Sequence, residues 1–386
     1  MRNVGVVARG IRTPIIRQGD NLEDIVVDAV LAASKSEGFE IREKDIIAIT
    51  ESVVAKAQGN YVTLDDVALD IESKFGKNAE IGVIFPIFSR NRFSLILKGI
   101  SRGAKKVYLQ LSYPHDEVGN PLVDPMDIYK KNINPYSDVF TEEEFRKTFG
   151  RETTINPFTK IDIIDYYKDM GDNIEIVVAN NPTEIVKYTS NILVADIHTR
   201  HRSKELIKEA CGDKVFGLDD IMSSSIDGSG FNEDYGLLGS NASSDEVLKL
   251  FPRNCKIFVN NIQEKMKEKT GKHLEVMIYG DGAFKDPAAG IWELADPVVS
   301  PAYTSGLEGT PSEYKLKFLA DSLGLKDDEI LNKIKDRNIS QEEAIGTTPR
   351  QIPDLIGSLA DLTSGSGDRG TPVIFVQGFF DNYSDE

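Results

Sequence analysis

The sequence predicts an α+β fold, in which a core of mixed sheets and helices is interrupted by an inserted α/β segment. Short apolar runs of strand length are interspersed with stretches whose apolar residues recur at helical spacing. From residue 79 to residue 230 the two patterns alternate, which favours a layer with parallel strands. The chain has 386 residues, of which 40% are hydrophobic, enough for about two or three domains with substantial cores.

Residues 1–78 are expected to form the amino-terminal part of the core. The apolar run Val4–Ala8 indicates a strand, and a proline-bearing turn follows it. A helix is expected to begin at Asn21 and to stop at Gly38, since these residue types favour the two ends of a helix. The further elements expected here are a strand at 45–50 and a helix from Thr63 to Gly76.

Residues 79–230 are expected to form the inserted α/β domain. Its predicted strands are 80–86, 105–111, 174–179 and 192–196, with helices around 93–100 and from Pro182. The loop at 112–136 is long enough that we expect it to be functional or partly disordered. A Ser- and Gly-rich stretch at 223–230 is the clearest flexible joint in the sequence.

Residues 231–386 are expected to form the carboxyl-terminal part of the core, with a helical insertion near 311–345. A helix is predicted from Ser243, and Pro252 is placed where the first turn of a helix favours proline. The remaining expected elements are a strand at 274–279, a helix at 352–362 and a strand at 371–377.

The composition excludes several classes of function. The formal net charge of −17 disfavours general binding to nucleic acid or to anionic membranes. The two cysteines, Cys211 and Cys255, have no spacing suited to a disulfide framework or a structural zinc site, so a cytoplasmic location fits best. No secretion signal or membrane span is visible in the sequence.

Two short motifs near the amino terminus suggest a ligand site. Arg12, Thr13 and Pro14 lie in a turn after a strand, where backbone amides and a hydroxyl can meet a ligand, although an ordinary proline turn would look the same. Lys56 lies between small residues at an expected strand end, where it can reach a phosphate, and Gly59 permits close backbone approach. The alternative for Lys56 is a solvated lysine on a β-edge.

Three stretches carry a resemblance to a known family. They are Gly10-Ile11-Arg12-Thr13-Pro14-Ile15-Ile16, Gly19-Asp20-Asn21-Leu22 and Ala55-Lys56-Ala57-Gln58-Gly59. In this order they resemble the amino-terminal signature of the coenzyme F420-0:L-glutamate ligase family, whose members join glutamate to a carboxylate at the expense of GTP. Similar stretches at 235–241, 270–281 and 370–378 extend the resemblance over residues 9–78 and 231–378. The arginine that the family usually has after the glycine is replaced by Asn60.

The resemblance also implies a metal site, which this sequence matches only in part. One aspartate of the family's metal site corresponds to Asp281, one position later, although an Asp-Gly turn explains that residue equally. The other metal ligand falls on Leu238, which cannot coordinate a metal. Asp234 lies close enough in sequence to replace it if the loop is rearranged.

A basic turn in the inserted segment suggests a second site. His198, Arg200 and Arg202 follow an apolar strand and precede a helix, a position where α/β sheets commonly bind ligands. These residues suit an anionic substrate, but a solvated helix start would have the same sequence. His198 and His201 are also spaced for a metal, without a known motif to support it. Residues 89–92 form a second basic turn with the same two interpretations.

The resemblance implies a nucleotide-dependent amide ligase that joins an amino acid such as glutamate to a small-molecule carboxylate through an acyl phosphate. It implies GTP or another NTP, Mg²⁺ or Mn²⁺, a homodimer, and a catalytic role for Lys56. The residues expected to shape the nucleotide pocket are Arg12, Thr13, Pro14, Lys56, Gly59, Ser240 and Asn241. The alternative is a non-catalytic nucleotide- or anion-binding regulatory protein that keeps the fold without the metal site, as Leu238 suggests.

Overall fold

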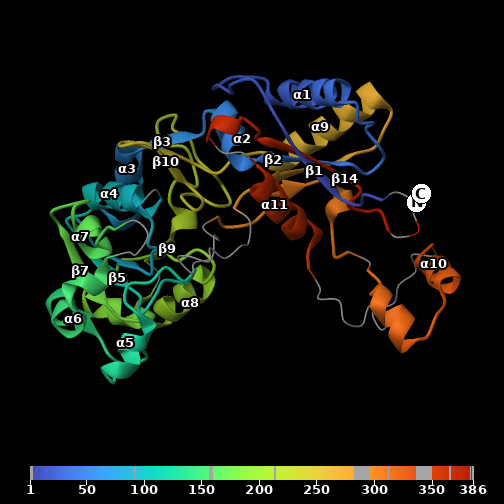
Figure 1. Ribbon diagram of the computed structural model, residues 1–386. Coiled ribbons are helices and arrows are strands. Elements are labelled where there is room, and N and C mark those ends of the chain that lie inside the picture. Colours follow the sequence, from blue (N-terminus) through green and yellow to red (C-terminus); the bar gives the residue numbers. More distant parts are fainter. Residues whose placement is uncertain are drawn as a thin grey trace. The chain divides into compact units, whose positions relative to one another are not determined.

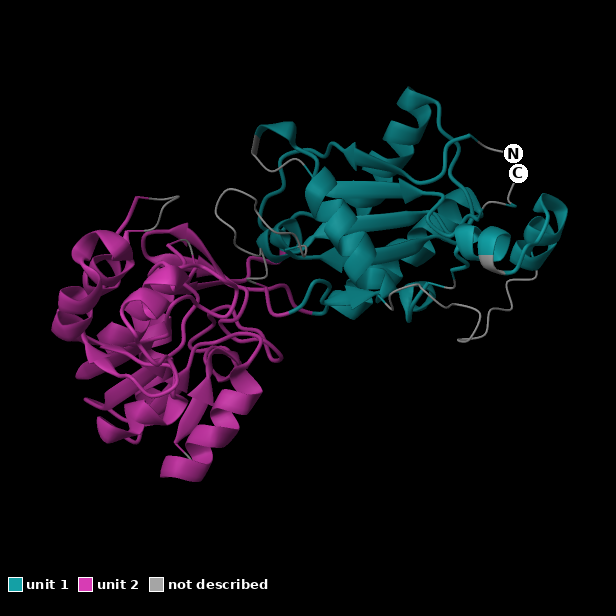
Figure 2. Ribbon diagram, turned by 60° about the horizontal axis from the view of Figure 1, so that its bottom comes forward, with its two compact units in different colours: residues 1–57, 254–282, 298–386 teal, residues 58–253, 283–297 magenta. Residues whose placement is uncertain are grey.

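The computed structural model describes residues 3–90, 92–155, 160–212, 214–281, 296–311, 313–335, 350–364, 367–382 and 384. The chain forms two compact units (Figure 2): unit 1 comprises residues 1–57, 254–282 and 298–386, and unit 2 comprises residues 58–253 and 283–297. Unit 2 is therefore inserted into the sequence of unit 1. Helices and strands are mixed along the chain, which confirms the predicted α+β fold.

Unit 1 is built on a five-stranded sheet. Its strands, in spatial order, are β1 (Val7–Ile11), β14 (Val373–Gln377), β2 (Ile46–Thr50), β12 (Glu275–Tyr279) and β13 (Ala302–Tyr303). Strands β2 and β12 are parallel, and β14 is antiparallel to both of its neighbours, β1 and β2. As a consequence β1, β2 and β12 all end at the same edge of the sheet, and β14 begins there.

Helices cover both faces of this sheet (Figure 1). Helices α1 (Leu22–Glu37) and α9 (Cys255–Thr270) pack on one face, and α11 (Ile352–Thr363) packs on the other. Because side chains alternate along a strand, Ile47 of β2 faces α1 and α9 whereas Ile46 faces α11. Burial on both faces explains why these strands are continuous apolar runs in the sequence.

The ends of α1 follow the predicted chemistry. The Asn21 side chain accepts a hydrogen bond from the Asp24 amide, and Gly38 closes the helix with a φ of 70°. Helix α3 (Leu64–Phe75) likewise begins with a capping box between Thr63 and Asp66. Both predicted helices are confirmed.

The predicted helix from Ser243 is wrong. Strands β10 (Asn241–Ser244) and β11 (Val247–Lys249) occupy that region and form a sheet with β3 (Tyr61–Thr63). Pro252 also lies outside a helix, since α9 begins at Cys255 after Asn254, whose φ is 55°. The pairing with β3, distant in sequence, overrides the local helical pattern.

The helical insertion predicted near 311–345 is described only in part. A π-helical turn, η5 (Phe318–Ser322), and a helix, α10 (Asp327–Lys335), lie in it. Leu319, Ile330 and Ile334 form a small apolar cluster there. Residues 336–349 lie outside the described residues.

Unit 2 contains a six-stranded sheet. In spatial order its strands are β6 (Phe140–Thr141), β7 (Ile174–Val178), β5 (Lys106–Leu111), β4 (Glu80–Ile84), β8 (Ile192–Val194) and β9 (Val215–Gly217). All pairs are parallel except that of β6 with β7. The chain starts in the middle at β4, proceeds outward to β7 and then reverses to β8 and β9. This is the order of a doubly wound α/β sheet, and it confirms the predicted parallel layer.

Helices also cover both faces of the unit 2 sheet. Helices α3 and α4 (Phe93–Gly103) pack with α7 (Ile163–Lys168) on one face. Helix α8 (Arg200–Cys211) and the short helix η2 (Pro182–Lys187) pack on the other. The two remaining described α-helices of the connection between β5 and β7 are α5 (Pro125–Lys130) and α6 (Glu142–Phe149).

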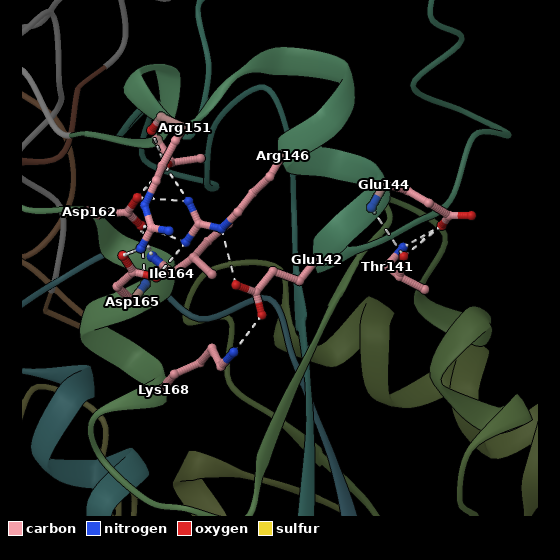
Figure 3. A network of polar contacts seen from close by, with 10 residues as sticks. Thr141, Glu142, Glu144, Arg146, Arg151, Asp162, Ile164, Asp165 and Lys168 are labelled. Atoms are coloured by element: carbon pink, nitrogen blue, oxygen red, sulfur yellow. Dashed lines mark hydrogen bonds and ion pairs between the residues drawn. The ribbon is translucent and has the colours of Figure 1, made fainter.

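An ion-pair network fixes α6 against α7 (Figure 3). The Arg146 guanidinium contacts the carboxylates of Glu142, Asp162 and Asp165 at 3.1, 2.9 and 2.6 Å. The Arg146 side chain is only 13% exposed, so water screens these contacts weakly. The positive charge of Arg146 is therefore neutralised by carboxylates of unit 2.

The chain enters and leaves unit 2 at adjacent positions. The Gln58 side-chain amide donates to the Arg253 carbonyl at 2.6 Å, and the Arg253 amide donates to the Gln58 side-chain oxygen at 2.9 Å. This reciprocal pair fastens the two ends of the inserted segment together. The Ser- and Gly-rich stretch 223–230 lies within unit 2, where the Gly230 amide donates to the Tyr61 carbonyl at 2.8 Å.

Candidate functional site

One edge of the unit 1 sheet gathers several of the predicted site residues. Arg12, Thr13 and Pro14 follow β1, and Asp281 follows β12 at the same edge. The segment that leads into β14 closes this edge, because the Thr13 amide donates to the Gly370 carbonyl at 3.2 Å. The structure therefore brings together the ends of strands that are far apart in the sequence.

A cavity of about 1210 Å³ lies beside β1 and α1. Arg12, Thr13 and Pro14 form part of its wall, and Arg9 and Arg369 add two more guanidinium groups. Ligand pockets for small molecules commonly measure roughly 300–1,000 Å³, so this cavity has room for a nucleotide. Alanines of α1 contribute an apolar side to it.

The arginines of the cavity differ in their contacts with other residues of the protein. Arg9 donates to the Gln377 side chain at 2.7 Å and lies over the Phe39 ring at 4.5 Å. Arg12 and Arg369 are exposed, and neither forms an ion pair with any described residue. Two cations at the cavity are therefore available to an anionic ligand. Arg369 is not predicted from the sequence, because it lies in a Gly-rich loop without a pattern of its own.

Lys56 lies in a helix and not at a strand end as predicted. It occupies the last turn of α2 (Glu51–Gln58), which follows β2 directly. Ala55 is fully buried and anchors this turn, while Lys56 is exposed and has no ion pair among the described residues. The Ala57 carbonyl accepts from the Gly19 amide at 2.9 Å, which ties this helix end to the loop that follows β1.

Gly59 and Asn60 lie near the start of unit 2, which begins at Gln58. Gly59 has a φ of 63°, the left-handed conformation that glycine favours. Asn60 is fully buried, and its side chain donates to the carbonyls of Phe231 and Phe251 at 3.1 and 2.8 Å and accepts from the Phe231 amide at 3.0 Å. Asn60 is thus a structural clamp, in the position where the family usually has arginine.

The stretch 235–241 forms a tight, buried turn. Gly236 has a φ of 51°, and a Cβ there would lie 2.4 Å from the Ile221 carbonyl oxygen, so only glycine fits. Ser240 is 1% exposed, and its hydroxyl has no hydrogen-bond partner among the described residues. Asn241 begins β10. The roles of Gly59, Ser240 and Asn241 in binding nucleotide stay predictions.

The expected metal centre is not tested by the described residues. They contain no group of three or more His, Cys, Asp or Glu side chains placed to hold an ion. Leu238, where the family has a ligand, is 1% exposed and packs in the core of unit 2. Asp234 is exposed nearby, and Asp281 is the last described residue after β12. With Leu238 in place of one family ligand, metal binding by Asp234 and Asp281 stays a prediction.

The basic turn of unit 2 lies at the start of α8, after β8, as the sequence indicates. His198 and Arg202 are exposed. The Arg200 guanidinium donates to Asp219 at 3.1 Å and to the Ile197 carbonyl, so most of its charge serves the fold. Substrate binding by His198, Arg200 and Arg202 stays a prediction.

A family model described as F420-0:gamma-glutamyl ligase matches residues 10–378. This chain belongs to the F420-0:gamma-glutamyl ligase family. The match includes the Arg12–Pro14 turn, Lys56 and the strand that ends at Gln377, and it confirms the resemblance found in the sequence.

Two curated relatives match a shorter part of the chain. A coenzyme F420:L-glutamate ligase of Methanosarcina acetivorans is 35% identical over 86 residues, which are 21% of this chain and 30% of the relative. One of Methanothermobacter thermautotrophicus is 30% identical over 73 residues, 18% of this chain and 27% of the relative. The chain therefore aligns with less than a third of the length of either relative.

A solved structure was also matched, an arginine decarboxylase of Campylobacter jejuni, at 9% identity and a TM-score of 0.16 over 90% of this chain and 66% of that one. A likeness at that score carries no information about this member of the F420-0:gamma-glutamyl ligase family. Within the part of the chain that the structure describes, no helix is long and apolar enough to cross a membrane.

Proposed function

We propose that this chain is a nucleotide-dependent amide ligase that joins an amino acid such as glutamate to a small-molecule carboxylate. The observation that carries the proposal is the cavity of unit 1, whose wall contains the family signature Arg12, Thr13 and Pro14. Arg12 and Arg369 leave two positive charges unpaired there, which suits the phosphates of GTP or another NTP.

The proposed reaction has two steps. A carboxylate oxygen of the substrate attacks the terminal phosphorus of the nucleotide, and the nucleoside diphosphate leaves. The amine of the amino acid then attacks the acyl carbon, phosphate leaves and the nitrogen loses a proton. In the first step Lys56 would stabilise the charge on the transferring phosphoryl group, since it is exposed and unpaired among the described residues.

Mg²⁺ or Mn²⁺ would enter with the nucleotide, and its chemistry would be to neutralise charge between the phosphates. Asp281, which follows β12 in unit 1, is the residue that we propose for contact with it. The family also suggests a homodimer, and we keep that state as part of the proposal.

The first test is nucleotide binding and turnover. Purified protein is titrated with GTP and with ATP, with and without Mg²⁺ or Mn²⁺, by thermal shift, and phosphate release is then measured with L-glutamate and candidate carboxylates. We expect Lys56→Ala to lower phosphate release by about 100-fold. Lys269→Ala is the matched control, because it removes an exposed lysine from the last turn of α9. No response to either nucleotide would overturn the proposal.

The second candidate is a non-catalytic binding protein, and Leu238 is the observation that favours it. A buried leucine replaces a family metal ligand there. Two results together would favour this candidate over the ligase. GTP or ATP would stabilise the wild type but not Lys56→Ala, and the wild type would release no phosphate under any of those conditions.

A further inference from the structure

The carboxyl end of the unit 2 sheet holds a second arrangement of polar groups. The strand order reverses at β4, whose neighbours are β5 on one side and β8 on the other. Ligands of doubly wound sheets bind outside the carboxyl ends of the strands at such a point. Two loops flank it here, residues 112–124 after β5 and residues 195–199 after β8.

Glu117, in the loop after β5, places its carboxylate at the start of α8. One oxygen accepts from the amides of Ile197 and His198 at 2.5 and 3.3 Å. The other accepts from the amides of His198 and Thr199 at 3.1 and 3.2 Å and from the Thr199 hydroxyl at 3.1 Å. The main chain of 197–199 therefore forms a site for a carboxylate, and the protein's own exposed Glu117 fills it.

Asp196 is the second part of the arrangement. It is 1% exposed, and one of its oxygens accepts from the Ser203 hydroxyl at 2.8 Å and lies 2.5 Å from the Thr199 hydroxyl, whose single proton it shares with Glu117, so the carboxyl group lies against the first turn of α8. Its other oxygen is buried and has no hydrogen-bond partner among the described residues. Burial, and to a smaller extent the nearby Glu117 charge, raises the pKa of Asp196 to about 6.

The Asp196 and Glu117 carboxylates share the Thr199 hydroxyl, and Arg200, at the start of α8, donates to Asp219 and the Ile197 carbonyl instead of to them. A buried acceptor without a donor costs about 1–3 kcal/mol, so a ligand that brings a donor to Asp196 recovers that free energy. A free α-amino acid carries such a donor, its ammonium group, directly beside a carboxylate. We propose that the start of α8 is a binding site for a free α-amino acid, whose carboxylate replaces Glu117 on the 197–199 amides and whose ammonium group pairs with Asp196.

The backbone of the loop that carries Glu117 is held by hydrogen bonds that do not involve the Glu117 side chain. The adjacent Asp116 is buried and accepts from the amides of Phe88, Val118 and Asn120 at 2.8, 3.1 and 2.8 Å. These bonds hold the loop backbone in place while the Glu117 side chain turns outward. Binding at this site does not depend on the ligase reaction proposed for unit 1, although an amino acid is the class of amine that such a reaction consumes.

The test measures binding of amino acids to the full chain in the absence of nucleotide. Each of the twenty common amino acids is titrated by calorimetry into the wild type, Glu117→Ala and Asp196→Asn. We expect at least one to bind, at least tenfold more tightly to Glu117→Ala and at least tenfold more weakly to Asp196→Asn. Glu143→Ala, which removes another exposed glutamate of unit 2, is expected to leave the affinity unchanged.

Two further measurements make the result decisive. The backbone amide resonances of residues 197–199 are expected to shift on binding, and glutarate, which lacks the ammonium group, is expected to bind more weakly than L-glutamate if L-glutamate is a ligand. Glu117→Gln, which removes the charge and keeps an acceptor oxygen, replaces the alanine variant if that variant unfolds. No binding to either Glu117 variant, or equal binding by wild type and Asp196→Asn, would overturn the assignment. Because nucleotide is absent, neither outcome bears on the ligase proposal.

Discussion

Three basic residues of unit 1 and two arginines of unit 2 are used in opposite ways. In unit 1, Arg12, Arg369 and Lys56 are exposed and have no ion pairs among the described residues. In unit 2, Arg146 and Arg200 are largely buried and contact carboxylates of the same unit. A paired, buried cation holds a fold together, whereas an unpaired one at a cavity keeps its charge for a ligand. The sequence does not show which arginines are paired, and only the packing distinguishes their roles.

The largest expected effect comes from removing a paired cation. Arg146→Ala should lower the free energy of unfolding of unit 2 by about 2–4 kcal/mol, because the partly buried Asp162 loses its partner. Urea unfolding followed by far-UV circular dichroism measures it. Lys147→Ala, an exposed neighbour on α6, should change the stability by less than about 0.5 kcal/mol. Equal effects of the two variants would contradict the distinction between paired and unpaired cations.

Removing an unpaired cation should affect binding and leave stability unchanged. Arg12→Ala should weaken nucleotide binding about tenfold to 100-fold, or about 1.4–2.7 kcal/mol, since a charge-assisted contact to phosphate is lost. Without ligand its unfolding curve should match that of the wild type. Calorimetry with GTP measures the affinity, and a urea titration measures the free energy of unfolding. Lys269→Ala is the control for both. A loss of stability without loss of affinity would place Arg12 among the structural cations.

The buried carboxyls of unit 2 should make its stability depend on pH. Burial raises the pKa values of Asp116 and Asp196 to about 6, above their ordinary value of 3.8. The folded state thus binds these protons more tightly than the unfolded state, so their contribution is greatest at low pH and is lost as pH rises through about 6. Urea midpoints should therefore rise between pH 7.5 and pH 5.5.

Asp196→Asn tests this assignment, because an amide cannot titrate. Between pH 7.5 and pH 5.5 the free energy of unfolding should rise by roughly 1 kcal/mol less in the variant than in the wild type. An unchanged slope would mean that Asp196 does not titrate in this range.

The smallest effect should come from salt. Raising sodium chloride from about 0.1 M to 0.5 M should weaken nucleotide binding several-fold, because exposed charges are screened within about a Debye length. The ion pairs of Arg146 are partly buried, so the unfolding free energy of unit 2 should change less. Calorimetry of GTP binding in both buffers measures the first effect. A GTP affinity that does not change with salt would argue against binding of the phosphates by Arg12 and Arg369.

Much of the fold could be predicted because local chemistry determines it. Asn21 and Gly38 mark the ends of α1 by their capping preferences alone, and the capping box at Thr63 does the same for α3. The strands β2 and β12 are apolar throughout because helices cover both faces of their sheet. In these elements the local pattern and the tertiary structure agree.

The errors arose where distant segments decide the outcome. Ser243 lies in a strand because β11 pairs with β3, which is far away in the sequence. In the motif, Asn60 stands where the family has an arginine, so the sequence suggests only that a positive charge is missing. In the structure Asn60 is buried, and its side chain binds the carbonyls of Phe231 and Phe251. The bond between Glu117 and the start of α8 joins two loops, so no sequence pattern reveals it.

The reciprocal pair between Gln58 and Arg253 has a consequence for protein engineering. Because the two ends of the insert leave unit 2 fastened side by side, the insert is a cassette with adjoining ends. Insertions whose ends adjoin disturb the host fold least. Exchange of residues 58–253 for another domain with adjoining ends is therefore expected to leave the unit 1 ends of the junction undisturbed, provided that residues 283–297, the second segment of unit 2, are exchanged with them.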